Sequence, residues 1–178
     1  GGIVILHSRD LVNWKTIGYV IQDLPGQLKD ERFNYTVMDH YSKGVYAPSL
    51  RYHNKKFWVY FTTYNNGGIY VATAKKITGP WTDPVLVEAG KGLIDPCPLW
   101  DDDGRVFLVH AFAGSRAGIK SIIVIKEMNS EGTKTIDDGV LVYDGHEKDP
   151  TVEGPKCYKR NGYYYIFAPA GGVSTGWQ

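Results

Sequence analysis

The chain has 178 residues, enough for one domain with a sizeable core, and its net charge is +1 with 22% charged residues. This balance gives no basic field for nucleic acid, and no apolar run approaches the roughly 18 residues of a membrane span. Aromatic residues make up 13%, with 13 Tyr and 21 Gly, which favours short strands and tight turns over helical bundles. Cys97 and Cys157 are too few for a disulfide framework. We expect both to be core thiols, with a single bridge between them as the alternative.

Short apolar runs bounded by Gly, Pro, Asn or Asp predict strands joined by turns along the whole chain. In chain order the runs are residues 3–6, 57–61, 69–74, 106–112, 121–125, 140–143 and 163–168. The sequences DDDG at 101–104 and RNG at 160–162 indicate hairpin turns, because Gly and Asn accept positive φ. Residues 25–44 are polar and are predicted to form a loop over one face.

Three segments share one pattern in which a proline and alternating apolar residues lead through a polar turn to an aromatic strand. They are residues 46–61, 96–112 and 153–169. The alignment matches Pro48, Pro98 and Pro155, about 50 to 60 residues apart, and HSRDLVNW (7–14) resembles TAKKITGPW (73–81). Such a period with four strands per unit is typical of β-propeller blades, whereas a β-sandwich, the competing all-β fold, does not predict the repeat.

The repeat divides the chain into two complete blades and parts of two others. Residues 1–24 are assigned to the end of a first blade, 45–90 and 94–145 to two complete blades, and 152–178 to the start of a fourth. We therefore expect part of a single β-propeller that lacks strands at both ends.

Tyr46, Asp95 and Glu153 lie just before the repeat's prolines, at the start of each inner strand. A propeller would bring them to one mouth of its central channel, where binding sites tend to be. Two carboxylates in such a cleft suit glycoside hydrolysis, because one must stay protonated, and partial burial beside a negative charge raises its pKa. The alternative is that Asp-Pro and Glu-Gly-Pro only form turns.

Residues 93–121 and 152–172 resemble glycoside hydrolase family 43, five-bladed β-propellers that remove arabinofuranosyl or xylosyl units from plant polysaccharides. HSRDLVNW and GVYAPSLRYHNKKFWVYF fit the first and second blades of that family. The resemblance implies an exo-acting, inverting mechanism with Glu153 as general acid and Asp95 as the residue that raises the acid's pKa and orients it. The family's third acidic residue, the general base, lies in a first strand ahead of GGIVILHS, so the chain alone is expected to be inactive.

The resemblance also suggests substrate contacts and ligands. Tyr46 lies where the family usually carries an aromatic residue, often Trp, and is expected to stack on a sugar ring, or else to be a core Tyr. Arg116, in SRAG, is expected to bind a sugar hydroxyl or hold Asp95, with a surface Arg as the alternative. His110, Trp177 and Gln178 are further candidates, although a hydrogen-bonded core His is the favoured interpretation of His110. The expected substrate is an arabinose- or xylose-containing oligosaccharide or polysaccharide. We expect no required cofactor and no metal ligand among these residues. A structural calcium would be bound by residues of a later blade.

Two rival functions remain open. A retaining, fructosidase-like propeller would show Arg-Asp-Pro and Glu-Cys, where this chain has Ile94-Asp95-Pro96 and Glu153-Gly154. A non-catalytic propeller that binds carbohydrate would use the aromatic residues and would not need two axial carboxylates.

Overall fold

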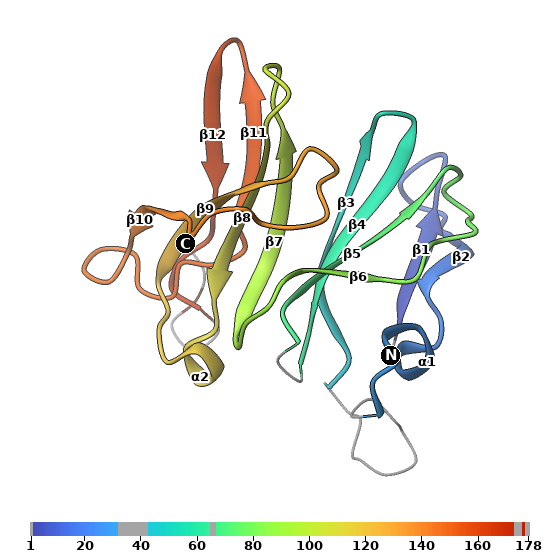
Figure 1. Ribbon diagram of the computed structural model, residues 1–178, viewed down its shortest axis with the longest axis horizontal. Coiled ribbons are helices and arrows are strands. Elements are labelled where there is room, and N and C mark those ends of the chain that lie inside the picture. Colours follow the sequence, from blue (N-terminus) through green and yellow to red (C-terminus); the bar gives the residue numbers. More distant parts are fainter. Residues whose placement is uncertain (1, 32–42, 65–66, 173–175, 177–178) are drawn as a thin grey trace.

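The computed structural model describes residues 2–31, 43–64, 67–172 and 176 and consists of four antiparallel sheets that follow one another in chain order (Figure 1). Within each sheet, neighbouring strands are consecutive in the sequence. This arrangement confirms the prediction of an all-β fold. Neither helix among the described residues is long and apolar enough to cross a membrane.

The two middle sheets have four strands each, and the outer two have two. The first sheet contains β1 (Ile3–His7) and β2 (Lys15–Ile21). The second contains β3 (Val45–His53), β4 (Lys56–Thr63), β5 (Ile69–Ala74) and β6 (Val85–Glu88). The third contains β7 (Leu93–Trp100), β8 (Val106–Phe112), β9 (Ile122–Met128) and β10 (Val140–Asp144). The fourth contains β11 (Lys156–Arg160) and β12 (Tyr163–Phe167), and the helices are α1 (Leu24–Leu28) and α2 (Gly114–Ala117).

The core lies between neighbouring sheets, in three separate clusters. Strand β4 contributes side chains to two of these clusters, one from each of its faces. Val59 and Phe61 pack toward the first sheet, while Trp58 and Tyr60 pack toward the third. Because successive side chains of a strand point to opposite faces, a strand with apolar residues on both faces can pack against two neighbouring sheets. Each sheet therefore depends on its neighbours for burial. Figure 1 shows the succession of the sheets from β1 to β12.

Two hairpin turns have the expected chemistry. Asn161 (φ 53°) and Gly162 (φ 80°) join β11 to β12, as the RNG motif predicts. Asn54 (φ 48°) and Lys55 (φ 59°) join β3 to β4 in the same way. Two consecutive residues with positive φ form the turn whose twist matches that of paired strands.

The segment predicted as a loop over residues 25–44 begins with helix α1 instead. Pro25 lies in its first turn, where a missing N–H costs nothing, and Leu24 is buried against the first core cluster. The Gln27 side-chain oxygen accepts the backbone N–H groups of Gln22 and Asp23. The burial of Leu24 and the hydrogen bonds of Gln27 thus stabilise a helix in a segment whose composition is polar. Residues 32–42 lie outside the described part of the chain.

The two cysteines are buried free thiols, as expected of core residues. The Cys97 sulfur accepts a hydrogen bond from the Arg51 guanidinium (2.9 Å) and one from the Cys157 backbone N–H (3.1 Å). Burial raises the pKa of the Cys157 thiol to about 11. Arg51 also lies over the ring of Tyr158, at 5.6 Å, and so connects β3, β7 and β11.

His110 is fully buried in the core and does not reach solvent. Its Nδ1 lies 3.2 Å from the Ala111 carbonyl oxygen, and its ring packs edge-on against Phe112. The structure therefore favours a core histidine over a sugar contact. Burial lowers the pKa of His110 below its ordinary value of 6.5, because the charged form would lose its hydration.

We expect His110 to make the fold sensitive to acid. Below about pH 6.5 the unfolded chain takes up a proton at this residue that the folded chain does not, so the free energy of unfolding falls with pH. A His110→Gln variant should lose less stability than the parent between about pH 7.5 and pH 5 in urea unfolding. The matched control is Val109→Ala, at a neighbouring buried position without a titratable group, which should keep the parent's pH dependence. An unchanged dependence in His110→Gln would contradict the assignment.

Candidate active site

The inner strands β3, β7 and β11 lie next to one another, and a left-handed residue occurs near the start of each. These residues are Ala47 (φ 46°), Asp95 (φ 57°) and Gly154 (φ 64°). They directly precede Pro48, Pro96 and Pro155. The pairing of β3 with β4 and of β7 with β8 shifts register at this point, which identifies a β-bulge. A positive φ directly before a proline thus recurs in three sheets, and a register shift accompanies it in two of them.

This recurrence corrects the alignment of the repeats. The matching proline of the third sheet is Pro96, and the sequence-based alignment on Pro98 is wrong. Glu153 consequently matches Ile94, one residue before Asp95. The two carboxylates occupy neighbouring positions of the repeat, not equivalent ones. Both prolines fit the sequence pattern, and only the pairing between strands shows which one follows the bulge.

Asp95 reaches from the third sheet to the backbone of the fourth. Its carboxylate accepts the N–H of Gly154 at 2.7 Å. Gly154 has no side chain to obstruct this approach, and its positive φ suits glycine. Burial raises the pKa of Asp95, while the Gly154 hydrogen bond and the charges of Lys156 and Arg116 oppose the rise. These three partners favour the ionised form of Asp95.

Glu153 lies beside Asp95 and is partly buried. Its own N–H donates to the Pro169 carbonyl at 3.2 Å, which fixes the backbone next to the segment that follows β12. Burial raises the pKa of Glu153 most, the negative charge of Asp95 raises it further, and Lys120 opposes both. A carboxyl group in this setting keeps its proton to higher pH than an ordinary Glu, as a proton donor requires.

Arg116 connects the carboxylates to two aromatic rings. From helix α2 its guanidinium carbon lies 5.7 Å from the ring centre of Tyr46 and 5.7 Å from that of Tyr64. Such distances allow cation–π attraction. Arg116 and Tyr46 are thus grouped with Asp95, whereas Trp177 and Gln178 lie outside the described residues.

Three members of this group were not among the candidates from sequence. Lys156 and Lys120 carry charges that act on Asp95 and Glu153 respectively, and Tyr64 completes the aromatic pair around Arg116. Lys156 directly follows the repeat's proline, and this position in the repeat is the sequence feature that could have identified it as a site residue. Nothing in the local sequence distinguishes Lys120 or Tyr64 from other surface residues.

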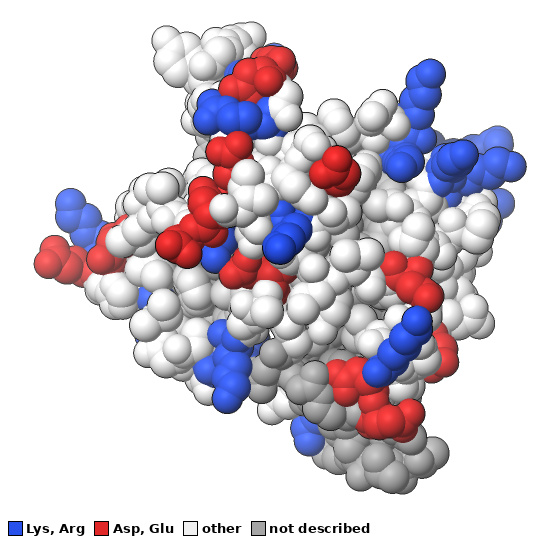
Figure 2. Space-filling model, in the orientation of Figure 1, with Lys and Arg blue, Asp and Glu red and all other residues white. Residues whose placement is uncertain are grey.

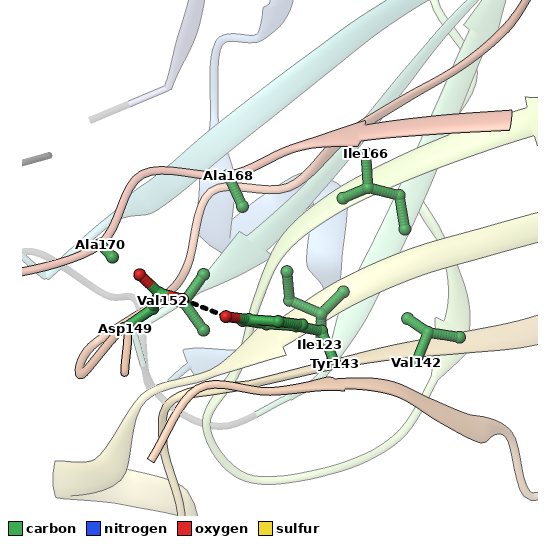
Figure 3. Close-up of a pocket in the computed structure, with 8 residues that line it drawn as sticks. All are labelled: Ile123, Val142, Tyr143, Asp149, Val152, Ile166, Ala168 and Ala170. Atoms are coloured by element: carbon green, nitrogen blue, oxygen red, sulfur yellow. Dashed lines mark hydrogen bonds between the residues drawn. The ribbon is translucent and has the colours of Figure 1, made fainter. Parts of the chain in front are cut away.

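A separate cavity of about 400 Å³ lies between the third and fourth sheets (Figure 3). Its walls are mostly aliphatic: Ile123, Val142, Tyr143, Asp149, Val152, Ile166, Ala168 and Ala170. The Tyr143 hydroxyl donates to the Asp149 carboxylate in this wall. Neither Asp95 nor Glu153 belongs to the lining, so the cavity is not the carboxylate site.

Acidic and basic side chains are interspersed with uncharged ones over the face shown in Figure 2. Within the described ranges, no three His, Cys, Asp or Glu side chains gather closely enough to hold a metal ion. The carboxylate group around Asp95 and Glu153 is therefore the candidate active site.

Comparison with known proteins agrees with this fold. The family model described as Glycosyl hydrolases family 43 matches residues 1–178. The chain belongs to this family. A putative beta-xylosidase from Xylanibacter ruminicola is 38% identical over 180 residues, covering 99% of this chain and 31% of the relative. A non-reducing end alpha-L-arabinofuranosidase from Bacteroides ovatus is 33% identical over 175 residues, covering 97% of this chain and 30% of the relative.

The structural relatives define the fold of which these sheets are a part. A xylan beta-1,4-xylosidase from Bacillus halodurans superposes with a TM-score of 0.73 at 30% identity, covering 95% of this chain and 32% of that structure. Family 43 structures of this kind are five-bladed β-propellers, and the expectation of a partial propeller is confirmed. The chain spans about a third of the length of the curated family 43 relatives it matches.

Proposed function

We propose that this chain forms part of an inverting, exo-acting glycoside hydrolase that removes arabinofuranosyl or xylosyl units from plant-derived oligosaccharides or polysaccharides. The observation that carries the proposal is the pairing of Glu153 with Asp95. A partly buried carboxyl whose pKa is raised lies beside a carboxylate held by a backbone N–H and flanked by two cations. The printed names of the family 43 relatives, beta-xylosidase and alpha-L-arabinofuranosidase, support the substrate class.

In the proposed reaction the bond between the anomeric carbon and the glycosidic oxygen breaks, and the Glu153 proton passes to that oxygen. A water oxygen bonds to the anomeric carbon from the opposite face, and the water's proton passes to a base. Asp95 stays ionised and keeps the proton on Glu153 until the substrate takes it. Tyr46 and Arg116 would contact the sugar beside these carboxylates.

The base is the third member of the proposed set. We propose that it lies in a strand ahead of Gly1, which is what the resemblance to family 43 implies. Asp10 is an unsuitable substitute, because its carboxylate accepts hydrogen bonds from Ser8 and Asn13 and from two backbone N–H groups of its own turn. We therefore propose that residues 1–178 alone do not turn over substrate, and robust hydrolysis by this chain would contradict that assignment of the base.

The test of the proposed function is the stereochemistry of the complete enzyme's product. Hydrolysis of an aryl α-L-arabinofuranoside and an aryl β-D-xyloside is followed by proton NMR from the first turnovers. The expected first product is the sugar with inverted anomeric configuration, and the faster substrate identifies the sugar. Retained configuration would favour the fructosidase-like alternative, and binding without turnover would favour a non-catalytic propeller.

A further inference from the structure

Lys156 is the first residue of β11 and lies three positions after Glu153. Its ammonium donates to the backbone carbonyl oxygens of Gly154 and Pro155, both at 3.3 Å. The side chain is partly buried, so it runs back along its own strand toward the carboxylates instead of extending into solvent. A lysine in this position contacts the turn that carries the proposed acid.

The backbone of Gly154 is consequently held from both sides. Asp95 accepts its N–H at 2.7 Å, and Lys156 donates to its carbonyl at 3.3 Å. Gly154 directly follows Glu153 and has a positive φ of 64°, a conformation that is available to glycine but strained for most residues. Holding this residue therefore fixes the direction in which the Glu153 side chain leaves the backbone.

The positive charges around the two carboxylates are unevenly distributed. Lys156, from β11, and Arg116, from α2, both act on Asp95, while Lys120, from the loop before β9, acts on Glu153. Two cations and a backbone N–H thus favour charge on Asp95, against the effect of its burial. Two neighbouring carboxylates resist a second ionisation, so these contacts favour the arrangement in which Asp95 carries the charge and Glu153 carries the proton.

We propose that Lys156 is a positioning residue of this site, which holds the Gly154 backbone against Asp95 and supplies a positive charge beside that carboxylate. The proposal rests on the proposed function, since it assigns Lys156 a role through Asp95 and Glu153. In this role Lys156 acts on the reaction through Asp95 and the Gly154 backbone. It maintains the separation of roles between an ionised Asp95 and a protonated Glu153.

The experiment is the pH profile of kcat/KM of the complete enzyme on an aryl glycoside, for the parent and three variants. Lys156→Met removes the charge and the hydrogen bonds, Lys156→Gln removes the charge but keeps a donor, and Lys156→Arg keeps both. Loss of a nearby cation raises the pKa of carboxyl groups, so both limbs of the profile should move to higher pH in the Met and Gln variants. We expect the acid limb, to which Asp95 contributes, to move more, by about one pH unit.

Controls separate this role from general damage to the fold. Lys156→Arg should keep the parent's limbs, and so should Lys148→Met, which removes an exposed lysine from the turn before β11. A residue that only stabilises the fold would lower activity equally at all pH values and leave the limbs in place. If the limbs stay in place in Lys156→Met and Lys156→Gln while Glu153→Gln has lost its activity, the role proposed for Lys156 is overturned and the proposed function stands. An active Glu153→Gln variant would overturn the proposed function as well.

Discussion

Replacing Glu153 by Gln in the complete enzyme should lower kcat on natural oligosaccharides by roughly 10²–10⁴-fold, the usual contribution of general acid catalysis. The amide cannot give a proton to the glycosidic oxygen, so a poor leaving group must depart as an alkoxide. The side chains have nearly the same size, and the Glu153 backbone bond to Pro169 does not depend on the carboxyl group. The fold should therefore survive, and steady-state kinetics would report the chemistry.

The leaving group distinguishes a lost acid from a damaged site. An aryl glycoside with a strongly acidic phenol needs little protonation, so Glu153→Gln should lose far less activity on it than on an oligosaccharide. The matched control is Glu147→Gln, because Glu147 is an exposed carboxylate six residues earlier in the same segment. Near-normal turnover of the oligosaccharide by Glu153→Gln would remove Glu153 from the mechanism.

Replacing Asp95 by Asn should move the alkaline limb of kcat/KM to lower pH. The pKa of Glu153 is raised first by burial and then by the charge of Asp95, and the variant removes only the second contribution. Glu153 then loses its proton at lower pH, and each unit of decrease leaves about tenfold less of the protonated acid at a given alkaline pH. The Asn oxygen can still accept the Gly154 N–H, so the backbone geometry should be retained.

The pH profile of kcat/KM for Asp95→Asn shows directly whether the alkaline limb moves to lower pH. Asp83→Asn, at an exposed position in the second sheet's last connection, should leave the limb where it is. An alkaline limb that stays in place or rises in Asp95→Asn would show that Asp95 does not raise the pKa of Glu153. Such a result would leave Asp95 as a backbone acceptor only.

Much of the fold follows from local sequence features. The apolar run of β4, the Asn161-Gly162 turn and the repeated aromatic strands are each recognisable within a few residues of chain, so their pattern predicts strands and hairpins directly. The start of the predicted loop is different. The burial of Leu24 stabilises helix α1 and depends on core residues that are distant in the sequence, whereas the Gln27 hydrogen bonds to Gln22 and Asp23 are local.

The candidate site could be predicted only in part. Asp95 and Glu153 stand out in the sequence because each precedes a proline in a repeat, and the structure brings them together through the Gly154 N–H. The register between them could not be predicted, because a β-bulge is defined by pairing with another strand. The burial of His110 and the approach of Lys156 likewise depend on which faces of neighbouring sheets meet.

The sequence by itself determined the strands, the turns, the propeller-type repeat and the resemblance to family 43, since each is carried by residues close together in the chain. Only the tertiary structure decided that Asp95 lies beside the backbone of Gly154, 59 residues away, and that Arg116 and Lys156 supply its countercharges. The physical reason is that charge and burial act through space. The pKa of Glu153 depends on which groups surround it after folding, and no short stretch of sequence contains all of them.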